Sequence, residues 1–144
     1  MAEMIVHADE IDLSTRGDGH ILDLTDALQR IVAESGVGTG QATAMVVGST
    51  AALSTLEYEP GLVEHDIVAA MERIAPEEGT YRHEETWHDD NGHSHVRATL
   101  TGPSLALPVV DGAVPFGTWQ QPVLIDYDTR PRERRVVVTV VGEG

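Results

Sequence analysis

The segment RRVVVTVV, residues 134–141, constrains the fold more than any other part of the chain. Its unbroken run of β-branched residues favours an extended strand over a helix. Two further apolar segments, SLALPVV at 104–110 and PVLIDYD at 122–128, predict strands in the same part of the chain. Because these strands follow a first half in which strand and helix patterns are mixed, the sequence predicts an α+β fold.

Helix and strand patterns alternate in the earlier part of the chain. Apolar residues recur every three or four positions in 23–38 and in 59–76, which predicts two amphipathic helices, the first ending at Gly36. Alternating or β-rich patterns predict strands at residues 4–13, 41–47, 50–56 and 95–101. The first of these strands is expected to contain a bulge near Asp9, where its alternation changes phase.

The charge balance of the chain is strongly acidic. It has 24 Asp and Glu against nine basic residues, all of them Arg, for a formal net charge of −15. Such a charge repels itself at low salt, whereas molar salt screens it within roughly 3 Å. The composition predicts adaptation to a salt-rich cytoplasm, with an ordinary acidic protein as the alternative. Nucleic acid is not an expected partner, because its phosphates need clustered cations. The only cluster is Arg130, Arg132, Arg134 and Arg135.

Composition also bears on the compartment and the core. The chain contains no cysteine, so disulfides and thiolate metal sites are excluded. MAEMIVHADEIDLS lacks the basic and apolar regions of a signal peptide, and no run approaches the ~20 apolar residues that span a bilayer. We therefore expect a cytoplasmic protein, not bound to membranes, with one domain over residues 1–144. Because aromatic residues make up only 4%, the core must consist of Val, Leu, Ile and Ala.

The stretch YRHEETWHDDNGHSH, residues 81–95, is the first candidate for a site. It holds four of the seven histidines, His83, His88, His93 and His95. Imidazoles titrate near neutral pH and suit proton transfer or metal binding. His93 and His95 would point the same way in an extended chain, but no recognised zinc-binding spacing is present. The alternative is a solvated polar loop.

Other candidates are single polar or aromatic residues in conspicuous places. Glu57 ends an otherwise apolar strand, and Asp66 lies on the flank of a helix's apolar stripe. Trp119 lies in a glycine-containing turn. Arg134 and Arg135 point to opposite faces of the last strand, so one of them could meet an anionic ligand. Alternatively, Glu57 is an exposed acid and Asp66 is paired with an arginine. Trp119 would then lie at a core edge or subunit interface, and Arg134 or Arg135 would form a salt bridge.

The order of the motifs along the chain resembles the YjbQ family from about residue 46 to the C-terminus. The matching segments are STAALSTLE, EHDI, YRHEETW, NGHSH, GPSLALPVVDGAVPFGTWQ and RRVVVTVVGE. The most specific features are N-x-x-x-H, at Asn91 and His95, and G-P-S-L-x-L-P-V…G-T-W-Q. The resemblance implies a compact α+β fold with a β-sandwich-like core of mostly antiparallel strands and two main helices, assembled as a homotrimer.

The resemblance also implies a set of site residues. They are Glu57, Asp66, His83, Asn91, His95, Trp119 and one of Arg134 and Arg135. His88 and His93 are not required by the family motif and are expected in a solvated loop. The chain departs from the family at Gly48, where relatives usually have His, and at Leu56, where they usually have Asn. The missing imidazole removes either a metal ligand or an acid–base group.

The family is associated with a thiamine-phosphate synthase activity, which joins a pyrimidine methyl diphosphate to a thiazole phosphate and releases pyrophosphate. In this hypothesis Arg134 or Arg135 holds phosphate, Glu57 and Asp66 hold a divalent ion, and His83 or His95 protonates the departing oxygen. The second hypothesis is a trimeric metal- or small-ligand-binding protein, in which His83, His95 and Glu57 bind zinc. The cofactor is then a divalent ion, zinc or magnesium. The third is a buried polar network that fixes the trimer. In each case we expect the site at a subunit boundary.

Overall fold

The computed structural model describes residues 2–144, and its first layer is a four-stranded antiparallel sheet, sheet A. In spatial order its strands are β1 (Met4–Thr15), β7 (Arg132–Glu143), β3 (Thr39–Val47) and β5 (Ser104–Val109). The β-branched run lies in β7, in the middle of the sheet, where Val136, Val138 and Val140 are fully buried. The strands predicted in these four places are confirmed.

The bulge predicted near Asp9 is wrong. β1 pairs with β7 residue for residue along its whole length, with Asp9 opposite Val138. Apolar side chains lie on both faces of this strand, since Ile5 packs against the core while Val6 faces outward. A strand that is apolar on both faces imitates a change of phase although its backbone is regular.

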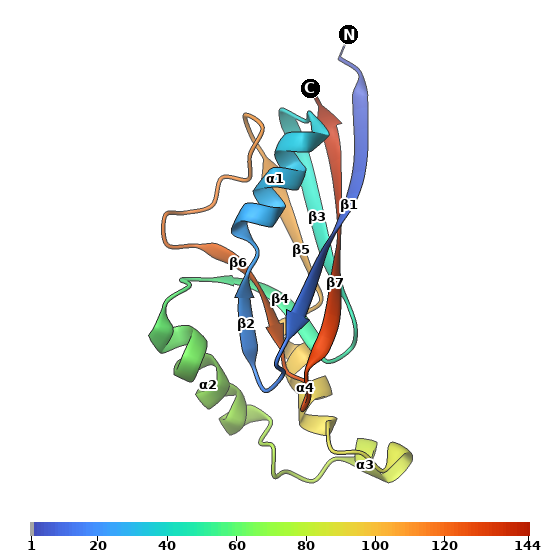
Figure 1. The fold of residues 1–144 in the computed structure, drawn as a ribbon, viewed down its shortest axis with the longest axis vertical. Coiled ribbons are helices and arrows are strands. Elements are labelled where there is room, and N and C mark those ends of the chain that lie inside the picture. Colours follow the sequence, from blue (N-terminus) through green and yellow to red (C-terminus); the bar gives the residue numbers. More distant parts are fainter. Residues whose placement is uncertain (1) are drawn as a thin grey trace.

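The second layer is a three-stranded antiparallel sheet, sheet B (Figure 1). Its order is β2 (His20–Asp23), β6 (Gln121–Asp126) and β4 (Ala51–Leu56). Leu53 and Leu124 on one face join the core that the inner face of sheet A forms. Val123 and Ile125 on the other face form a second core beneath the helices. The β-sandwich-like arrangement of mostly antiparallel strands is therefore confirmed, although β2 was not predicted.

Helices cover the ends and the outer face of this sandwich. α1 (Thr25–Ser35) buries Leu28, Ile31 and Val32 in the first core and ends at Gly36 in the left-handed conformation, as predicted. A π-helical turn, η1 (Leu62–Asp66), leads into α2 (Ile67–Ile74), and both pack on the outer face of sheet B. The cores are aliphatic as expected, with Tyr127 as the largest fully buried side chain.

The structure contains two further helices besides the two main helices that were predicted. α3 (Arg82–Trp87) and α4 (Gly92–Thr101) follow α2, so the strand predicted at 95–101 is wrong. The buried residues of α4 include Ser94, Arg97 and Ala98, which recur at helical spacing. Leu100, which the alternation placed on the same side as Ala98, is 58% exposed, whereas Ala98 is buried. The burial of Arg97, which donates to the Ala75 carbonyl at 2.9 Å, favours the helix in this segment. Alternation over so short a stretch does not distinguish a strand from a helix.

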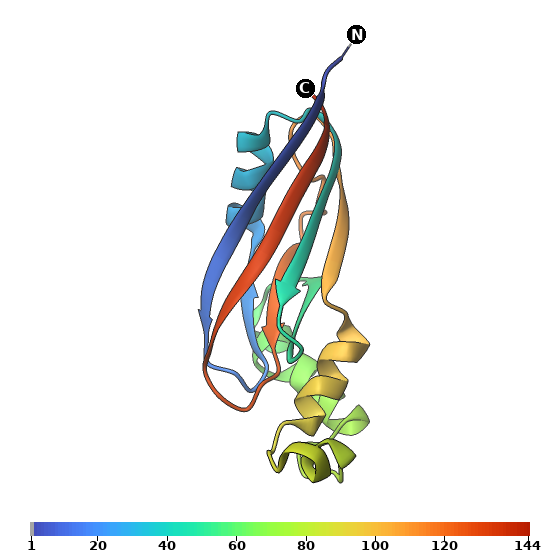
Figure 2. The same cartoon turned by 90° about the vertical axis from the view of Figure 1, so that its right-hand side faces the viewer.

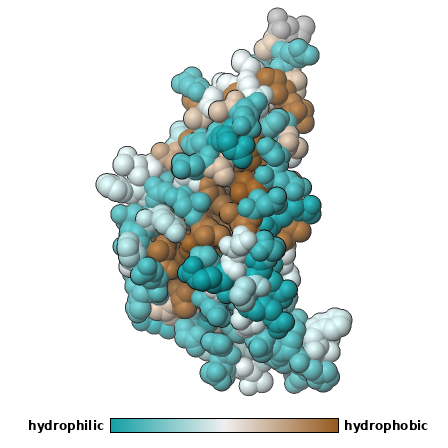
Figure 3. Space-filling model, in the orientation of Figure 1, coloured by the Kyte–Doolittle hydropathy of each residue, from teal (hydrophilic) through white to brown (hydrophobic). Residues whose placement is uncertain are grey.

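Sheet A has one covered face and one uncovered face. Figure 2 shows its four strands with no helix or sheet in front of them, while α1 and sheet B lie behind. The uncovered face carries the exposed apolar side chains Val6, Met45, Val47 and Val141. In the orientation of Figure 1, the surface is mostly hydrophilic with an apolar band across its middle (Figure 3). Within residues 2–144 no helix is both long and apolar enough to cross a membrane.

Candidate functional site

His83 and His95 are brought together by the packing of α3 against α4. Their ring centroids lie 4.3 Å apart with an interplanar angle of 51°. The Asn91 amide lies between α3 and α4, and the orientation that satisfies its neighbours directs its nitrogen to His83 Nε2 at 3.1 Å and to the Asp89 carboxylate at 3.2 Å. Asp89 Oδ1 is also 3.4 Å from His83 Nε2. The predicted residues His83, Asn91 and His95 thus form one cluster, to which the structure adds Asp89.

A glycine allows this close approach. Gly92, the first residue of α4, donates its N–H to Glu84 Oε1 of α3 at 2.6 Å. A Cβ at this position would lie 2.5 Å from both Glu84 Oε1 and Tyr81 Cβ, distances that real Cβ atoms do not adopt. α3 itself ends at His88 in the left-handed conformation, so the chain turns back immediately toward α4. The spacing between the two imidazoles therefore depends on an absent side chain.

The environment of His95 favours its neutral form. Burial lowers the pKa of the His95 imidazole, and the neighbouring His83 lowers it further. The carboxylates of Asp128, Asp89 and Glu84 raise it, but they offset only part of the decrease. Near neutral pH His95 is therefore an uncharged imidazole, able to accept a proton or to bind a metal ion. This state suits it less to the role of proton donor.

A buried ion-pair network lies beside this cluster. Arg134 donates from Nε and Nη2 to the Asp126 carboxylate at 2.7 and 3.0 Å, and from Nη2 to Thr50 Oγ1 at 2.7 Å. Asp126 also accepts from Thr15 Oγ1 at 2.6 Å. Asp128 accepts from Thr50 Oγ1 at 2.9 Å. Two strand ends and the start of β7 are thus tied together by hydrogen-bonded charges.

Asp128 connects the network to the histidines, because its charge acts on His95. Burial alone would raise the pKa of the Asp128 carboxyl. Hydrogen bonds from Thr129, Thr50 and Arg132, together with the positive charge of Arg132, lower the pKa below its usual value. Asp128 therefore remains an anion beside the cluster.

The two terminal arginines differ in position, as their places on β7 predict. Arg134 lies in the interior network, with only 9% of its surface exposed. Arg135 lies on the uncovered face of sheet A, where its Nη1 is 3.4 Å from Glu10 Oε1. Of the two, Arg134 is the one linked to the histidine cluster, since its Nη2 lies 3.7 Å from Asp128, whose charge acts on His95.

Gly48 gives Arg134 its room. The Arg134 guanidinium lies so close to Gly48 that a Cβ there would be 2.5 Å from Nη1, and the Gly48 backbone has φ +142°. Within the described part of the chain Nη1 has no hydrogen-bond partner. An imidazole at position 48 would displace this arginine. The position of Arg134 therefore requires the glycine that replaces the family's histidine.

The remaining predicted residues lie elsewhere in the chain. Glu57 follows the end of β4 and Trp119 precedes β6, and both side chains are exposed. β4 runs from Ala51, opposite Asp126, to Leu56, opposite Gln121. Six residues of strand separate the two ends by roughly 20 Å. A single chain therefore does not bring Glu57 or Trp119 to the histidines.

Asp66 and His93 also depart from expectation. Asp66 ends η1, is exposed, and contacts His65 Nδ1 at 2.8 Å rather than an arginine. His93 is not in a solvated loop, since it lies in α4 with 3% exposure and its ring centroid is 6.3 Å from that of Tyr81. His88 is exposed, as expected. Among residues 2–144 no three His, Asp or Glu side chains are placed to hold a metal ion together.

Several site residues were missed from the sequence. Asp126 and Asp128 were assigned only to a strand, and Thr50 only to the start of another. A signal was available, because PVLIDYD places two carboxylates at the end of an apolar run shortly before the arginine cluster. Buried carboxylates need cationic or hydrogen-bonding partners, and the arginine cluster that begins at Arg130 supplies candidates close by in the sequence.

Comparison with known proteins agrees with the architecture. Residues 9–143 match the model of the family described as UPF0047 protein YjbQ-like. The chain is 36% identical to a UPF0047 protein of Archaeoglobus fulgidus over 129 residues, which is 90% of this chain and 97% of the relative. It is 33% identical to one of Methanothermobacter thermautotrophicus over 140 residues, covering 97% and 95%.

Solved structures give the same result. A YbjQ-like protein from Sulfolobus solfataricus P2 superposes with a TM-score of 0.91 at 35% identity, covering 98% of this chain and 100% of that one. A protein from Aeropyrum pernix K1 gives a TM-score of 0.86 at 31% identity, covering 95% and 99%. With the family model matched over nearly the whole chain, the protein belongs to the YjbQ family.

Proposed function

We propose that the His83–His95 cluster binds a small phosphorylated molecule and carries out a condensation of the thiamine-phosphate synthase type. The observation that supports it most is the pair of imidazoles, 4.3 Å apart, beside a buried arginine network. In the reaction the ring nitrogen of a thiazole phosphate forms a bond to the methylene carbon of the pyrimidine. The carbon–oxygen bond to the diphosphate breaks, and pyrophosphate leaves with the electron pair.

The charge of the diphosphate must be neutralised for it to leave. Arg134 offers only Nη1 for this purpose, because Nε and Nη2 are already bound to Asp126 and Thr50. A divalent ion would supply the missing positive charge. The donor set fits zinc in kind, with two imidazoles and the Asp89 carboxylate, but within one chain these groups are not arranged as a complete site. His83 and His95 would therefore hold the ion together with a ligand from another subunit.

A subunit boundary would complete the site. Glu57 and Trp119 lie at the opposite end of sheet B from the network, and Trp119 is 73% exposed. In a homotrimer, Glu57 and Trp119 of one copy would meet the histidine cluster of the next. The uncovered apolar face of sheet A gives such an assembly surface to bury. This proposal unites all the predicted site residues except Asp66 and Arg135.

The metal content of the purified protein tests the histidine pair. In protein purified in molar salt without chelators, we expect about one divalent ion per chain, measured by mass spectrometry. His95→Ala should reduce the content at least about tenfold, since it removes one of two imidazole ligands. His88→Ala is the matched control, because His88 is exposed and lies outside the cluster. Equal metal content in wild type and His95→Ala would contradict the metal site.

A second candidate is binding without turnover. It is favoured by the internal pairing of Arg134, which leaves few cations for two phosphorylated substrates in a chain of net charge −15. Incubation with the pyrimidine diphosphate and the thiazole phosphate separates the two candidates. Formation of thiamine phosphate and pyrophosphate supports the condensation, whereas binding of either substrate without product supports the second candidate.

We also propose that the chain is adapted to high salt in a cytoplasm rich in ions. The thermal midpoint of unfolding should rise by more than about 4 °C between 0.1 and 2 M KCl, because ions screen the self-repulsion of 24 acidic residues. Calorimetry over this range checks the expectation. A midpoint that does not change with salt would favour the ordinary acidic protein.

A further inference from the structure

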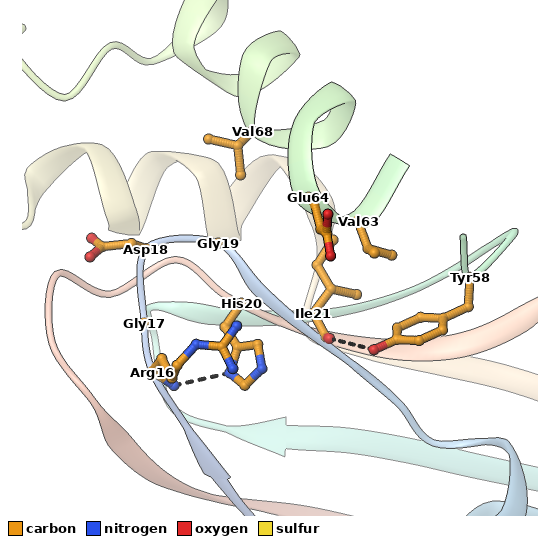
Figure 4. Close-up of a pocket in the computed structure, with 10 residues that line it drawn as sticks. All are labelled: Arg16, Gly17, Asp18, Gly19, His20, Ile21, Tyr58, Val63, Glu64 and Val68. Carbon is orange, nitrogen blue, oxygen red and sulfur yellow. Dashed lines mark hydrogen bonds between the residues drawn. The ribbon is translucent and has the colours of Figure 1, made fainter. Parts of the chain in front are cut away.

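A cavity lies between the turn that joins β1 to β2 and the helical segment formed by η1 and α2. Its volume is about 480 Å³, within the range of roughly 300–1,000 Å³ that small-molecule sites occupy. Figure 4 shows its lining, which includes Arg16 and His20 from the turn, Glu64 and Val68 from the helices, and Tyr58. None of its lining residues belongs to the His83–His95 cluster or to the Arg134 network.

The turn that forms one wall is fixed in place. Gly17, Asp18 and Gly19 all have positive φ, at 76°, 53° and 83°. The N–H groups of Asp18 and Gly19 donate to the carbonyls of Asp128 and Asp126 at 2.6 and 2.7 Å. No Cβ fits at Gly19, because it would collide with the side chain of Val68 on α2. The backbone of this wall is therefore fixed.

One side of the cavity is a donor end. The backbone N–H of Arg16 donates to His20 Nδ1 at 3.0 Å, so the proton of the neutral ring is on Nε2. Burial, followed by the charge of Arg16, lowers the pKa of His20 and keeps the ring neutral. The Arg16 guanidinium makes no ion pair or hydrogen bond with any residue from 2 to 144, although acidic residues far outnumber arginines.

The opposite side is an acceptor end. Glu64 projects from η1 across the cavity from Arg16 and His20, beside Val63 (Figure 4). Its carboxylate also has no hydrogen-bond partner in the described chain. Ile21 and Tyr58 also line the cavity (Figure 4). Tyr58 lies beyond Ile21, on the side away from Arg16, and its hydroxyl donates to the Ile21 carbonyl at 3.2 Å. The cavity thus has separated positive and negative ends with an apolar wall.

We propose that this cavity binds a small zwitterion of the α-amino acid class. Its carboxylate would accept from the Arg16 guanidinium and His20 Nε2–H, its ammonium would donate to Glu64, and its side chain would pack on Tyr58 and Val68. A simple anion would be repelled by Glu64 and Asp18, and a simple cation by Arg16. A zwitterion satisfies both ends and carries no net charge against the acidic protein.

Binding of free amino acids in molar KCl tests this site, with titration calorimetry as the measurement. At least one common amino acid should bind saturably to the wild-type protein. Its affinity should fall about tenfold or more in Arg16→Gln and in Glu64→Gln, because each loses a charged hydrogen bond. Arg73→Gln is the matched control, an exposed arginine of α2 that does not line the cavity.

Chemical variants of the bound amino acid locate its two ends. The N-acetyl derivative lacks the ammonium group, so it should bind the wild-type protein more weakly than the free amino acid does. Glu64→Gln should bind the N-acetyl derivative and the free amino acid with similar affinities. The amide derivative lacks the carboxylate, so it should bind the wild-type protein more weakly than the free amino acid does. Arg16→Gln should bind the amide and the free amino acid with similar affinities. Absence of saturable binding for every amino acid up to about 10 mM, or an affinity in both variants equal to that of wild type, would overturn the proposal.

Discussion

Arg134→Met is expected to reduce the free energy of unfolding by about 3–5 kcal/mol, the largest change in stability that we predict for a single charged residue. Methionine resembles arginine in length but leaves the fully buried Asp126 carboxylate without its cationic partner. Thr50 loses a donor at the same time. Urea unfolding in molar salt, followed by circular dichroism, measures the difference.

Arg135→Met provides the control for this experiment. Arg135 is the next residue of β7, but its side chain is 52% exposed and its ion pair with Glu10 spans 3.4 Å. Exposed pairs contribute little, so the change should stay within about 0.5 kcal/mol. Equal effects of the two substitutions would show that burial of the Arg134–Asp126 pair does not stabilise the fold.

Gly92→Ala is expected to separate α3 from α4 and to disassemble the histidine cluster. The added Cβ would lie 2.5 Å from Tyr81 Cβ and Glu84 Oε1, so the helices must shift. Overpacking of this kind costs about 1–3 kcal/mol. Because separated helices would expose His95 to solvent and move His83 away from it, the pKa of His95 should rise toward its ordinary value. NMR titration of the imidazole protons detects this change, and metal binding should weaken in parallel.

Gly38→Ala is the matched control for Gly92→Ala. The Cβ of an alanine at position 38 would approach no atom closer than 3.4 Å, an ordinary contact, and its φ is not positive. The titration of His95 should be unchanged in this variant. If Gly92→Ala also left the titration of His95 unchanged, close packing of α3 on α4 would not control the imidazole pair.

Much of the fold could be predicted because its strands carry local signals. The run from Val136 to Val141 is β-branched throughout and lies in β7, one of the two inner strands of sheet A. The helix at 95–101 could not be predicted in the same way, since alternation over so few residues also occurs in helices. What decides it is the burial of Arg97, whose Nη2 lies 2.6 Å from Glu72 in a distant helix. Such a partner is visible only in three dimensions.

The site was predictable where the residues are close in the sequence. His83, Asn91 and His95 fall within one short segment, and the structure does place them together. Glu57 and Trp119 resemble site residues equally well, yet the length of sheet B holds them apart from the histidines. The sequence does not show that Glu57 and Trp119 lie at the end of sheet B that is far from the histidines.

The order of strands in sheet A also determines when the sheet can form during synthesis on the ribosome. β1 and β3 are not hydrogen-bonded to each other, because each pairs with a different edge of β7. The first strand synthesised must therefore wait, with its apolar residues uncovered, until residues 132–143 have left the exit tunnel. Contacts of such long sequence separation form slowly. The sheet can close only after its last strand has been synthesised, so β1 lacks its sheet partner for almost the whole of translation.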